Sequence, residues 1–285
     1  MKYRIRHSTT YTYTGQVFLE PHVVRLCPRT DPAQRLHKFD LEMSPPPAGM
    51  SLGIDAENNP FHLVWFNDLT SEFRLDSSFL VETLKANPFD SFLTCEDRLP
   101  LKLSDDEAAV LGPCLDRFRL IGPGDAELIK SLCREVEAQS NGNVFSTLQT
   151  LNTYLFEYIE KTSRRDEGLQ SIATTLMSAR GACRDTTLVF MAACRSWGIP
   201  SRFVSGCQEG DPEQPEGELH AWAEVYLPGF GWKGYDPTHG LAVADHHIAY
   251  AASAIPEQTL PVAGTFRGTG VAASMRHRVE MAIEP

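Results

Sequence analysis

The segment from Arg180 to Pro200 constrains the fold more than any other part of the chain. Between Asp185 and Trp197 nearly every residue is apolar, with one arginine near the end. A helix that is apolar on every side must be buried on every side. Gly198 and the proline that follows would end it. The sequence therefore predicts a fully buried helix in this segment.

Cys183 stands at the predicted start of this helix, two residues after Gly181. The unpaired N–H groups and the positive end of the helix dipole stabilise a thiolate there, so the pKa of such a cysteine falls below the ordinary value of about 8.5. Gly181 would let a substrate backbone approach, and the N–H of Cys183 could donate to a developing oxyanion. Cys194 returns to the same helix face about 16 Å deeper, inside the protein. We therefore predict that Cys183 is a nucleophile.

The other six cysteines carry no comparable signal. The total of seven is odd, the cysteines are widely spaced and no C-x-x-C pair occurs. This pattern argues against a disulfide framework and against a zinc ribbon. A cysteine without such context is most often a small buried apolar residue. We expect this of Cys27, Cys95, Cys114, Cys133, Cys194 and Cys207.

A hairpin downstream of the helix supplies the partners that a thiolate needs. His220 lies in an alternating strand, which places Trp222 on the same face and Glu218 at its rim. A Pro-Gly-Phe-Gly turn leads into a second strand that carries Tyr235 and Asp236. A carboxylate on a neighbouring strand can lie about 5 Å from a histidine and fix its tautomer. We predict His220 as the base and Asp236 as its orienting group, with Trp222 and Tyr235 as an aromatic wall.

The rest of the pattern predicts further regions. Residues 1–105 have the short strands and frequent turns of an antiparallel sandwich, without a helical period. Residues 106–124 contain several Pro and Gly residues and predict a connector with short helices at most. Beyond it we expect a helix over 126–137 capped by Asp125, and a helix up to Ile159 capped by Asn143 or Ser146. A closing strand is expected over 274–283.

Five linked motifs give the second half of the chain a family resemblance. In order they are Gly181-Ala-Cys-Arg-Asp, Arg195-Ser-Trp-Gly-Ile-Pro-Ser-Arg-Phe-Val-Ser-Gly, His220-Ala-Trp-Ala-Glu-Val-Tyr, Gly231-Trp and Tyr235-Asp-Pro-Thr-His-Gly. Together they resemble the bacterial transglutaminase-like superfamily, whose members are commonly described as proposed cysteine proteases. His7-Ser-Thr-Thr-Tyr-Thr-Tyr, Leu26-Cys-Pro-Arg and the Asn58-Asn59 turn resemble the β-rich N-terminal domain that often precedes this core.

The resemblance implies an α+β protein of two domains. An N-terminal antiparallel β-sandwich-like domain over residues 1–105 and a connector over 106–124 would precede a papain-like transglutaminase core over 125–285, which includes the C-terminal strand. By this likeness Cys183, His220 and Asp236 take the roles of a catalytic triad. Arg184 follows the cysteine where many relatives have glutamine, and it is a candidate substrate contact.

Charge and hydropathy argue against several other classes. The formal net charge is −11 and no stretch is strongly basic, so a nucleic-acid partner is not expected. No apolar run approaches the ~20 residues of a membrane span. The charged N-terminus lacks the apolar region of a secretory signal, so we expect a cytoplasmic protein without a membrane partner. A zinc site at His239, His246 and His247 is not expected either, because adjacent histidines point apart on a strand. No cofactor is implied.

Three functions stay open. The first is cysteine-dependent hydrolysis of a peptide or protein amide, in which the Cys183 thiolate attacks the carbonyl and His220 passes a proton to the leaving amine. The second is transamidation, in which another amine takes the place of water. The third is a non-catalytic peptide-binding or assembly module, which the presence of all three triad residues disfavours. We favour hydrolysis slightly, while the natural substrate and the oligomeric state do not follow from the sequence.

The loop before His220 is strongly acidic. Its carboxylates are Glu209, Asp211, Glu213, Glu216 and Glu218, and it contains no positive charge. The ordinary interpretation is a solvated connector. The functional interpretation is that the loop flanks the cleft and favours cationic or amine-bearing substrates.

Overall fold

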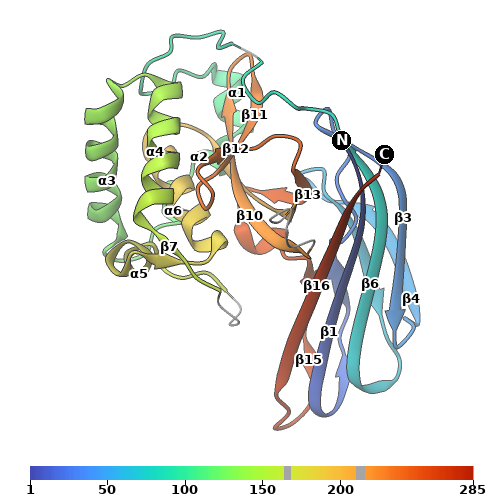
Figure 1. Cartoon of the computed structure of the whole chain (residues 1–285). Helices are drawn as coiled ribbons and strands as arrows, with labels where there is room; N and C mark the ends of the chain where they lie inside the picture. Colours follow the sequence, from blue (N-terminus) through green and yellow to red (C-terminus); the bar gives the residue numbers. More distant parts are fainter. Residues whose placement is uncertain (91, 164–167, 210–215, 285) are drawn as a thin grey trace.

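The computed structural model describes residues 1–90, 92–163, 168–209 and 216–284, and the side chains of 216–218 lie outside this description. The chain is a mixed α+β protein, as predicted. One hydrophobic core lies between the helices and the strands of residues 201–236, and a second lies mainly between the sheets built from the N-terminal strands. Figure 1 shows the helices gathered at one side of the molecule and the long strands at the other.

Residues 1–83 and the last strands of the chain, from residue 262 on, form an antiparallel sandwich, which we call the N-terminal half. Its strands are β1 (Lys2–Leu19), β2 (His22–Val24), β3 (Gln34–Ser44), β4 (Gly49–Ile54), β5 (Pro60–Trp65), β6 (Leu69–Thr83), β14 (Val262–Ala263), β15 (Phe266–Arg267) and β16 (Ala273–Glu284). One sheet has the order β16-β1-β6-β3 and the other β14-β2-β5-β4. Alternate side chains of β1 such as Tyr3 and Ile5 are buried, as the period of two predicts. The described part of residues 1–100 contains no helix, as expected.

The second half holds the helices and a shorter sheet. The helices are α1 (Asp105–Val110), α2 (Gly112–Leu115), the 3-10 turn Arg117–Arg119, α3 (Asp125–Ser140), α4 (Val144–Tyr158), α5 (Ile172–Ser178), α6 (Cys183–Ser196) and the 3-10 turn Pro256–Thr259. The strands are β7 (Glu160–Lys161), β8 (Arg180–Gly181), β9 (Ser201–Gln208), β10 (Glu216–Leu227), β11 (Gly231–Asp236), β12 (Leu241–Ala242) and β13 (His247–Ser253). The connector contains only short helices, as predicted.

The buried helix is confirmed as α6. Every residue from Asp185 to Arg195 is buried, and the helix contacts α3, α4 and α5 as well as β9 and β10. It ends where predicted, since Gly198 adopts the left-handed conformation with φ 71°. None of the described helices is both long and apolar enough to span a membrane.

The two flanking helices begin close to the predicted caps. Asn143 caps α4, because its side chain accepts the backbone N–H of Ser146 at 3.0 Å. Asp125 is the first residue of α3 rather than its cap, and Gly124 occupies the cap position in the left-handed conformation. The buried Asp125 carboxylate instead accepts the backbone N–H groups of Gly122 and Ala173 at 2.5 and 2.7 Å. It therefore ties the start of α3 to α5.

The predicted closing strand exists, but it pairs mainly with the N-terminal strand β1 and not with the core of residues 125–285, to which we assigned it. β16 pairs with β1 along twelve residues, from Lys2↔Glu284 to Tyr13↔Ala273. It also pairs briefly with the start of β10, so one sheet runs from the sandwich into the second half. The N- and C-termini consequently lie side by side (Figure 1). Periodicity predicts a strand but not its partner, so the sequence could not assign β16 to the N-terminal sheet.

Candidate active site

Cys183 is placed by the first turn of α6. As the first residue of the helix it has an N–H without an intrahelical acceptor. The buried Asp185 carboxylate accepts the Ala182 N–H at 2.9 Å and the Gln170 N–H at 2.8 Å, which fixes the turn. The Thr187 hydroxyl donates to the Ala221 carbonyl at 3.2 Å and ties α6 to β10 beside His220. Cys183 is partly exposed here, whereas Cys194 is buried, as predicted.

The thiol of Cys183 differs chemically from the other six. Burial alone would raise the pKa of Cys183, but hydrogen bonds from the His220 side chain and the Ala221 backbone, with the charge of His220, lower it below the ordinary value. Burial raises the pKa of Cys27 and Cys114 to about 11 and that of Cys133 and Cys207 to about 12, and it also raises the pKa of Cys95 and Cys194. Cys183 is therefore the thiol most easily ionised.

His220 and Asp236 meet across the predicted hairpin, in which β10 and β11 are antiparallel. Nε2 of His220 lies 2.8 Å from Oδ2 of Asp236, and both side chains are almost fully buried. Since Nε2 is engaged by the carboxylate, Nδ1 is the ring nitrogen left for the Cys183 thiol. Burial lowers the pKa of His220, but the hydrogen bonds to Asp236 and Cys183 outweigh it and raise this pKa to about 10. Both shifts favour the form in which the Cys183 thiol is ionised and the His220 imidazole is protonated.

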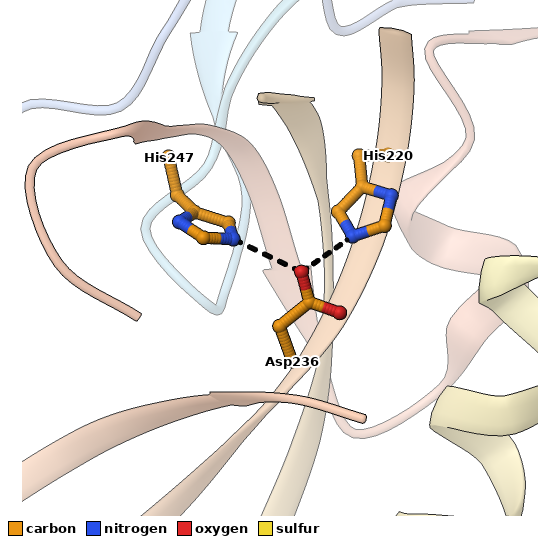
Figure 2. A group of neighbouring side chains, drawn as sticks. All are labelled: His220, Asp236 and His247. Carbon is orange, nitrogen blue, oxygen red and sulfur yellow. Dashed lines mark hydrogen bonds and ion pairs between the residues drawn. The ribbon is translucent and has the colours of Figure 1, made fainter. Parts of the chain in front are cut away.

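The Asp236 carboxylate accepts more hydrogen bonds than a triad requires. Besides the hydrogen bond from His220, its Oδ2 accepts one from Nδ1 of His239 at 2.8 Å and one from Nε2 of His247 at 3.1 Å. Figure 2 shows His220 and His247 approaching the carboxylate from two sides. Its Oδ1 accepts the backbone N–H groups of Thr238 and His239 at 3.0 and 3.3 Å. Burial would raise the pKa of Asp236, but the three histidine hydrogen bonds hold it well below its ordinary value.

The predicted substrate contacts lie in several environments. Arg184 is half-buried and donates from Nε to the Gly168 carbonyl at 2.8 Å. Gly181 is buried, and a Cβ there would meet Thr175 and Asp185 at 3.1 and 3.2 Å. Close packing of α5 and α6 is therefore a reason for the glycine, and its contact with substrate stays a prediction. The side chain of Glu218 lies outside the described residues.

The predicted aromatic wall is buried rather than open. Trp222 is 1% exposed and stands beside the triad histidine, with the rings of Trp222 and His220 6.3 Å apart. Tyr235 is also 1% exposed and stacks on Phe190 of α6, on the sheet face opposite to Asp236. In this structure Trp222 supports the triad and Tyr235 belongs to the core between sheet and helix, so neither presents a surface to substrate.

The acidic loop is described only in part, whereas the adjacent His246 and His247 are described in full. Glu209 accepts from the Tyr3 hydroxyl at 2.8 Å and contacts His246 at 2.7 Å, so it joins the two halves of the chain. Residues 210–215 and the side chains of 216–218 lie outside the described residues, and the substrate role of the loop stays a prediction. His246 and His247 point apart, as predicted. The role of His247 at Asp236 was missed, because a histidine in an apolar strand gives no signal of its partner.

Two of the triad residues, together with His247, also resemble a metal site. His220, Asp236 and His247 offer ligand atoms within 4.8 Å of one another, and imidazole and carboxylate are ordinary zinc ligands. An ion there would occupy Asp236 and Nε2 of His220, which the triad needs. We therefore expect EDTA to leave amide-cleaving activity unchanged and added Zn²⁺ to inhibit it, measured as initial rates. Activity that EDTA abolishes and Zn²⁺ restores would contradict the triad.

Comparison with known proteins agrees with this geometry. The family model described as bacterial transglutaminase-like N-terminal region matches residues 3–82, and that of the transglutaminase-like superfamily matches residues 130–237, which include all three triad residues. An uncharacterized protein of Mycobacterium leprae is 25% identical over 273 residues, 94% of each chain. A protein-glutamine gamma-glutamyltransferase of Pseudomonas aeruginosa is 31% identical over 118 residues, which are 38% of this chain and 17% of that protein.

Among solved structures, a proposed cysteine protease from Cytophaga hutchinsonii has the same fold. Its TM-score is 0.69 at 18% identity, with 99% of this chain and 90% of the other covered. Residues 3–82 thus belong to the bacterial transglutaminase-like N-terminal region, and residues 130–237 to the transglutaminase-like superfamily.

Proposed function

We propose that this protein catalyses cysteine-dependent acyl transfer on peptide or protein amides, with Cys183 as nucleophile, His220 as proton carrier and Asp236 as the orienting group. The observation that carries the proposal is the unbroken series of contacts from thiol to imidazole to buried carboxylate at the start of α6. Members of the transglutaminase-like family are usually cysteine-dependent enzymes, which supports chemistry that depends on Cys183.

Acylation would begin from the thiolate and the imidazolium. The Cys183 sulfur attacks the amide carbonyl, and the N–H groups at the start of α6 face the developing oxyanion. Nδ1 of His220 then gives its proton to the leaving nitrogen as the C–N bond breaks. The products are a free amine, a thioester on Cys183 and a neutral imidazole. Asp236 stays a carboxylate throughout and keeps the His220 proton on Nε2.

Deacylation would reverse the proton transfers. Water, or a second amine, attacks the thioester and gives a proton to Nδ1 of His220, and the thiolate leaves. With water the product is a carboxylic acid, and with an amine it is a new amide. We favour hydrolysis, since water is always present. The Pseudomonas aeruginosa relative supports transamidation as the second candidate.

A peptide-library screen with and without a primary amine distinguishes these outcomes. We expect wild-type protein to release acids from amide substrates in both conditions, with at most a minor amine adduct by mass spectrometry. The Cys183→Ala variant should give neither product, because no thioester can form. An amine adduct as the main product would establish transamidation. Equal turnover by wild type and Cys183→Ala would reject cysteine catalysis.

A further inference from the structure

The outer edge of β13 is held by side chains instead of a strand. Among the described strands β13 pairs with β9 alone. On its other edge the Gln34 amide accepts the Ala249 N–H and donates to the Ala249 carbonyl, both at 2.8 Å. The Asn59 amide does the same with Ala252, at 2.8 and 2.9 Å. Each amide thereby supplies the pair of hydrogen bonds that a neighbouring residue of a strand would make.

We call the Gln34 and Asn59 side chains the clamp. Both residues belong to the N-terminal half and are held in place by their own surroundings. Gln34 is 4% exposed and Asn59 is 0% exposed. The Arg29 guanidinium donates to Asn59 at 2.5 Å, and Asp55 accepts from Asn59 at 3.0 Å. The backbone N–H of Arg29 also donates to the Ala249 carbonyl at 3.1 Å. The Leu26-Cys-Pro-Arg and Asn58-Asn59 motifs, which play no part in the proposed chemistry, therefore meet at β13.

The first residue of the clamped strand reaches the triad. His247 is almost fully buried, and its Nε2 lies 3.1 Å from Oδ2 of Asp236. Because the pKa of Asp236 is held low, the carboxylate can only accept, so Nε2 of His247 carries the proton. Nδ1 of His247 is buried without a hydrogen-bond partner. An unpaired buried nitrogen lowers the stability of the fold, so Nδ1 does not account for a histidine at this position. The favourable contribution of the side chain is the hydrogen bond from its Nε2–H to Asp236.

We propose that His247 is a positioning residue that holds the Asp236 carboxylate in the orientation that His220 requires, and that Gln34 and Asn59 position His247 by fixing β13. The inference rests on the proposed function, since it concerns the same triad. It gives the N-terminal half a role in the chemistry: the sandwich fixes β13, β13 fixes His247, and His247 fixes Asp236. His220 contacts Cys183 at the end of this series.

Two substitutions of His247 separate the hydrogen bond from the packing. Leucine has a similar volume and no donor, whereas the Gln amide can place an N–H near the position of Nε2. We expect His247→Leu to lower kcat about tenfold or more, the order seen when a supporting hydrogen bond of a site is removed, with KM changed less than about twofold. His247→Gln should recover most of kcat. Wild-type kcat in His247→Leu, or equal loss in both variants, would overturn the proposal.

A double-mutant cycle tests the clamp. Gln34→Met keeps the length of the side chain and removes both hydrogen bonds to Ala249. We expect it to lower kcat about threefold to tenfold in wild-type protein and less than about twofold in His247→Leu, because Gln34 acts through His247. Equal effects in the two backgrounds would overturn this route. Tyr250→Phe, on the same strand but packed in the sandwich core, is the control and should keep wild-type kcat.

A second readout needs no substrate. The rate at which iodoacetamide alkylates Cys183 at pH 6 reports the thiolate–imidazolium pair directly. It should fall in His247→Leu and recover in His247→Gln while the melting temperatures of the two variants stay within a few degrees of each other. If Cys183→Ala shows the proposed function to be wrong, this readout still decides the role of His247. An unchanged alkylation rate in His247→Leu would reject that role alone.

Discussion

Replacing Asp236 with asparagine is expected to lower kcat by roughly four orders of magnitude, the size that the same change has in the serine-protease triad. The reason lies in the surroundings of this carboxylate. Oδ2 faces ring nitrogens of His220, His239 and His247, and Oδ1 faces the backbone N–H groups of Thr238 and His239. Every one of these hydrogen bonds needs an acceptor on residue 236.

An asparagine cannot satisfy both sides. If its amide NH₂ faces the backbone, it opposes two N–H donors and destabilises the turn after β11. If it faces the histidines, His220 must move its proton from Nε2 to Nδ1, and Nδ1 can then no longer accept a proton from Cys183. A buried donor without an acceptor also costs about 1–3 kcal/mol. We therefore expect a less stable protein with an unproductive tautomer of His220.

The measurement is kcat on an amide substrate together with the melting temperature. Asp245→Asn is the matched control, because Asp245 lies near the same end of β13 and contacts His246 rather than the triad. It should keep kcat within about twofold, as surface substitutions usually do. If Asp236→Asn kept kcat within tenfold of wild type, Asp236 would not be the orienting group.

Local pattern was enough to predict most of the elements that carry the site. The apolar run predicted α6, because a helix that is apolar on every face must be buried on every face. The Pro-Gly-Phe-Gly turn predicted the hairpin of β10 and β11. Strand parity then predicted that His220 and Trp222 share one face of β10 and that Ala221 and Ala223 share the other. These features depend on neighbours in sequence, and the structure confirms them.

Long-range pairing could not be predicted in the same way. β16 lies beside β1, more than 250 residues away in sequence, and no periodicity encodes that choice. The same limit explains His247: it reaches Asp236 only because β9 and the N-terminal amides place β13 there. Trp222 was assigned to the correct face, but that face is covered by β13 and Val204, so it is buried instead of lining a cleft.

The second large effect concerns the reactivity of the cysteines. Iodoacetamide at pH 6 is expected to label Cys183 roughly 10³-fold faster than any of the other six, even allowing for the lower intrinsic nucleophilicity of a thiolate of low pKa. Burial raises the pKa of all the others, to about 11 or 12 for Cys27, Cys114, Cys133 and Cys207, so almost none of the six is ionised at pH 6. Uniform slow labelling, read by peptide mapping, would favour the peptide-binding module over an enzyme.

His220 should account for most of this difference. In His220→Gln the hydrogen bond and the charge of His220 are lost, burial is then opposed mainly by the backbone hydrogen bond from Ala221, and the pKa of Cys183 should rise. Labelling of Cys183 at pH 6 should fall by roughly two orders of magnitude or more and then increase steadily with pH up to 9. In wild-type protein the lowered pKa of Cys183 shifts ionisation of the thiol to lower pH, so the labelling rate should increase less over that range than in His220→Gln.

Catalytic activity should also depend on pH, at alkaline values. The leaving amine needs the proton of His220, whose pKa is raised to about 10, so kcat/KM should decline as pH increases through that value. His246→Gln is the control for labelling and activity, because His246 is exposed and contacts Glu209 instead of the triad. It should match wild type at every pH. A labelling profile of His220→Gln equal to that of wild type would show that His220 does not ionise Cys183, and the triad would lose its base.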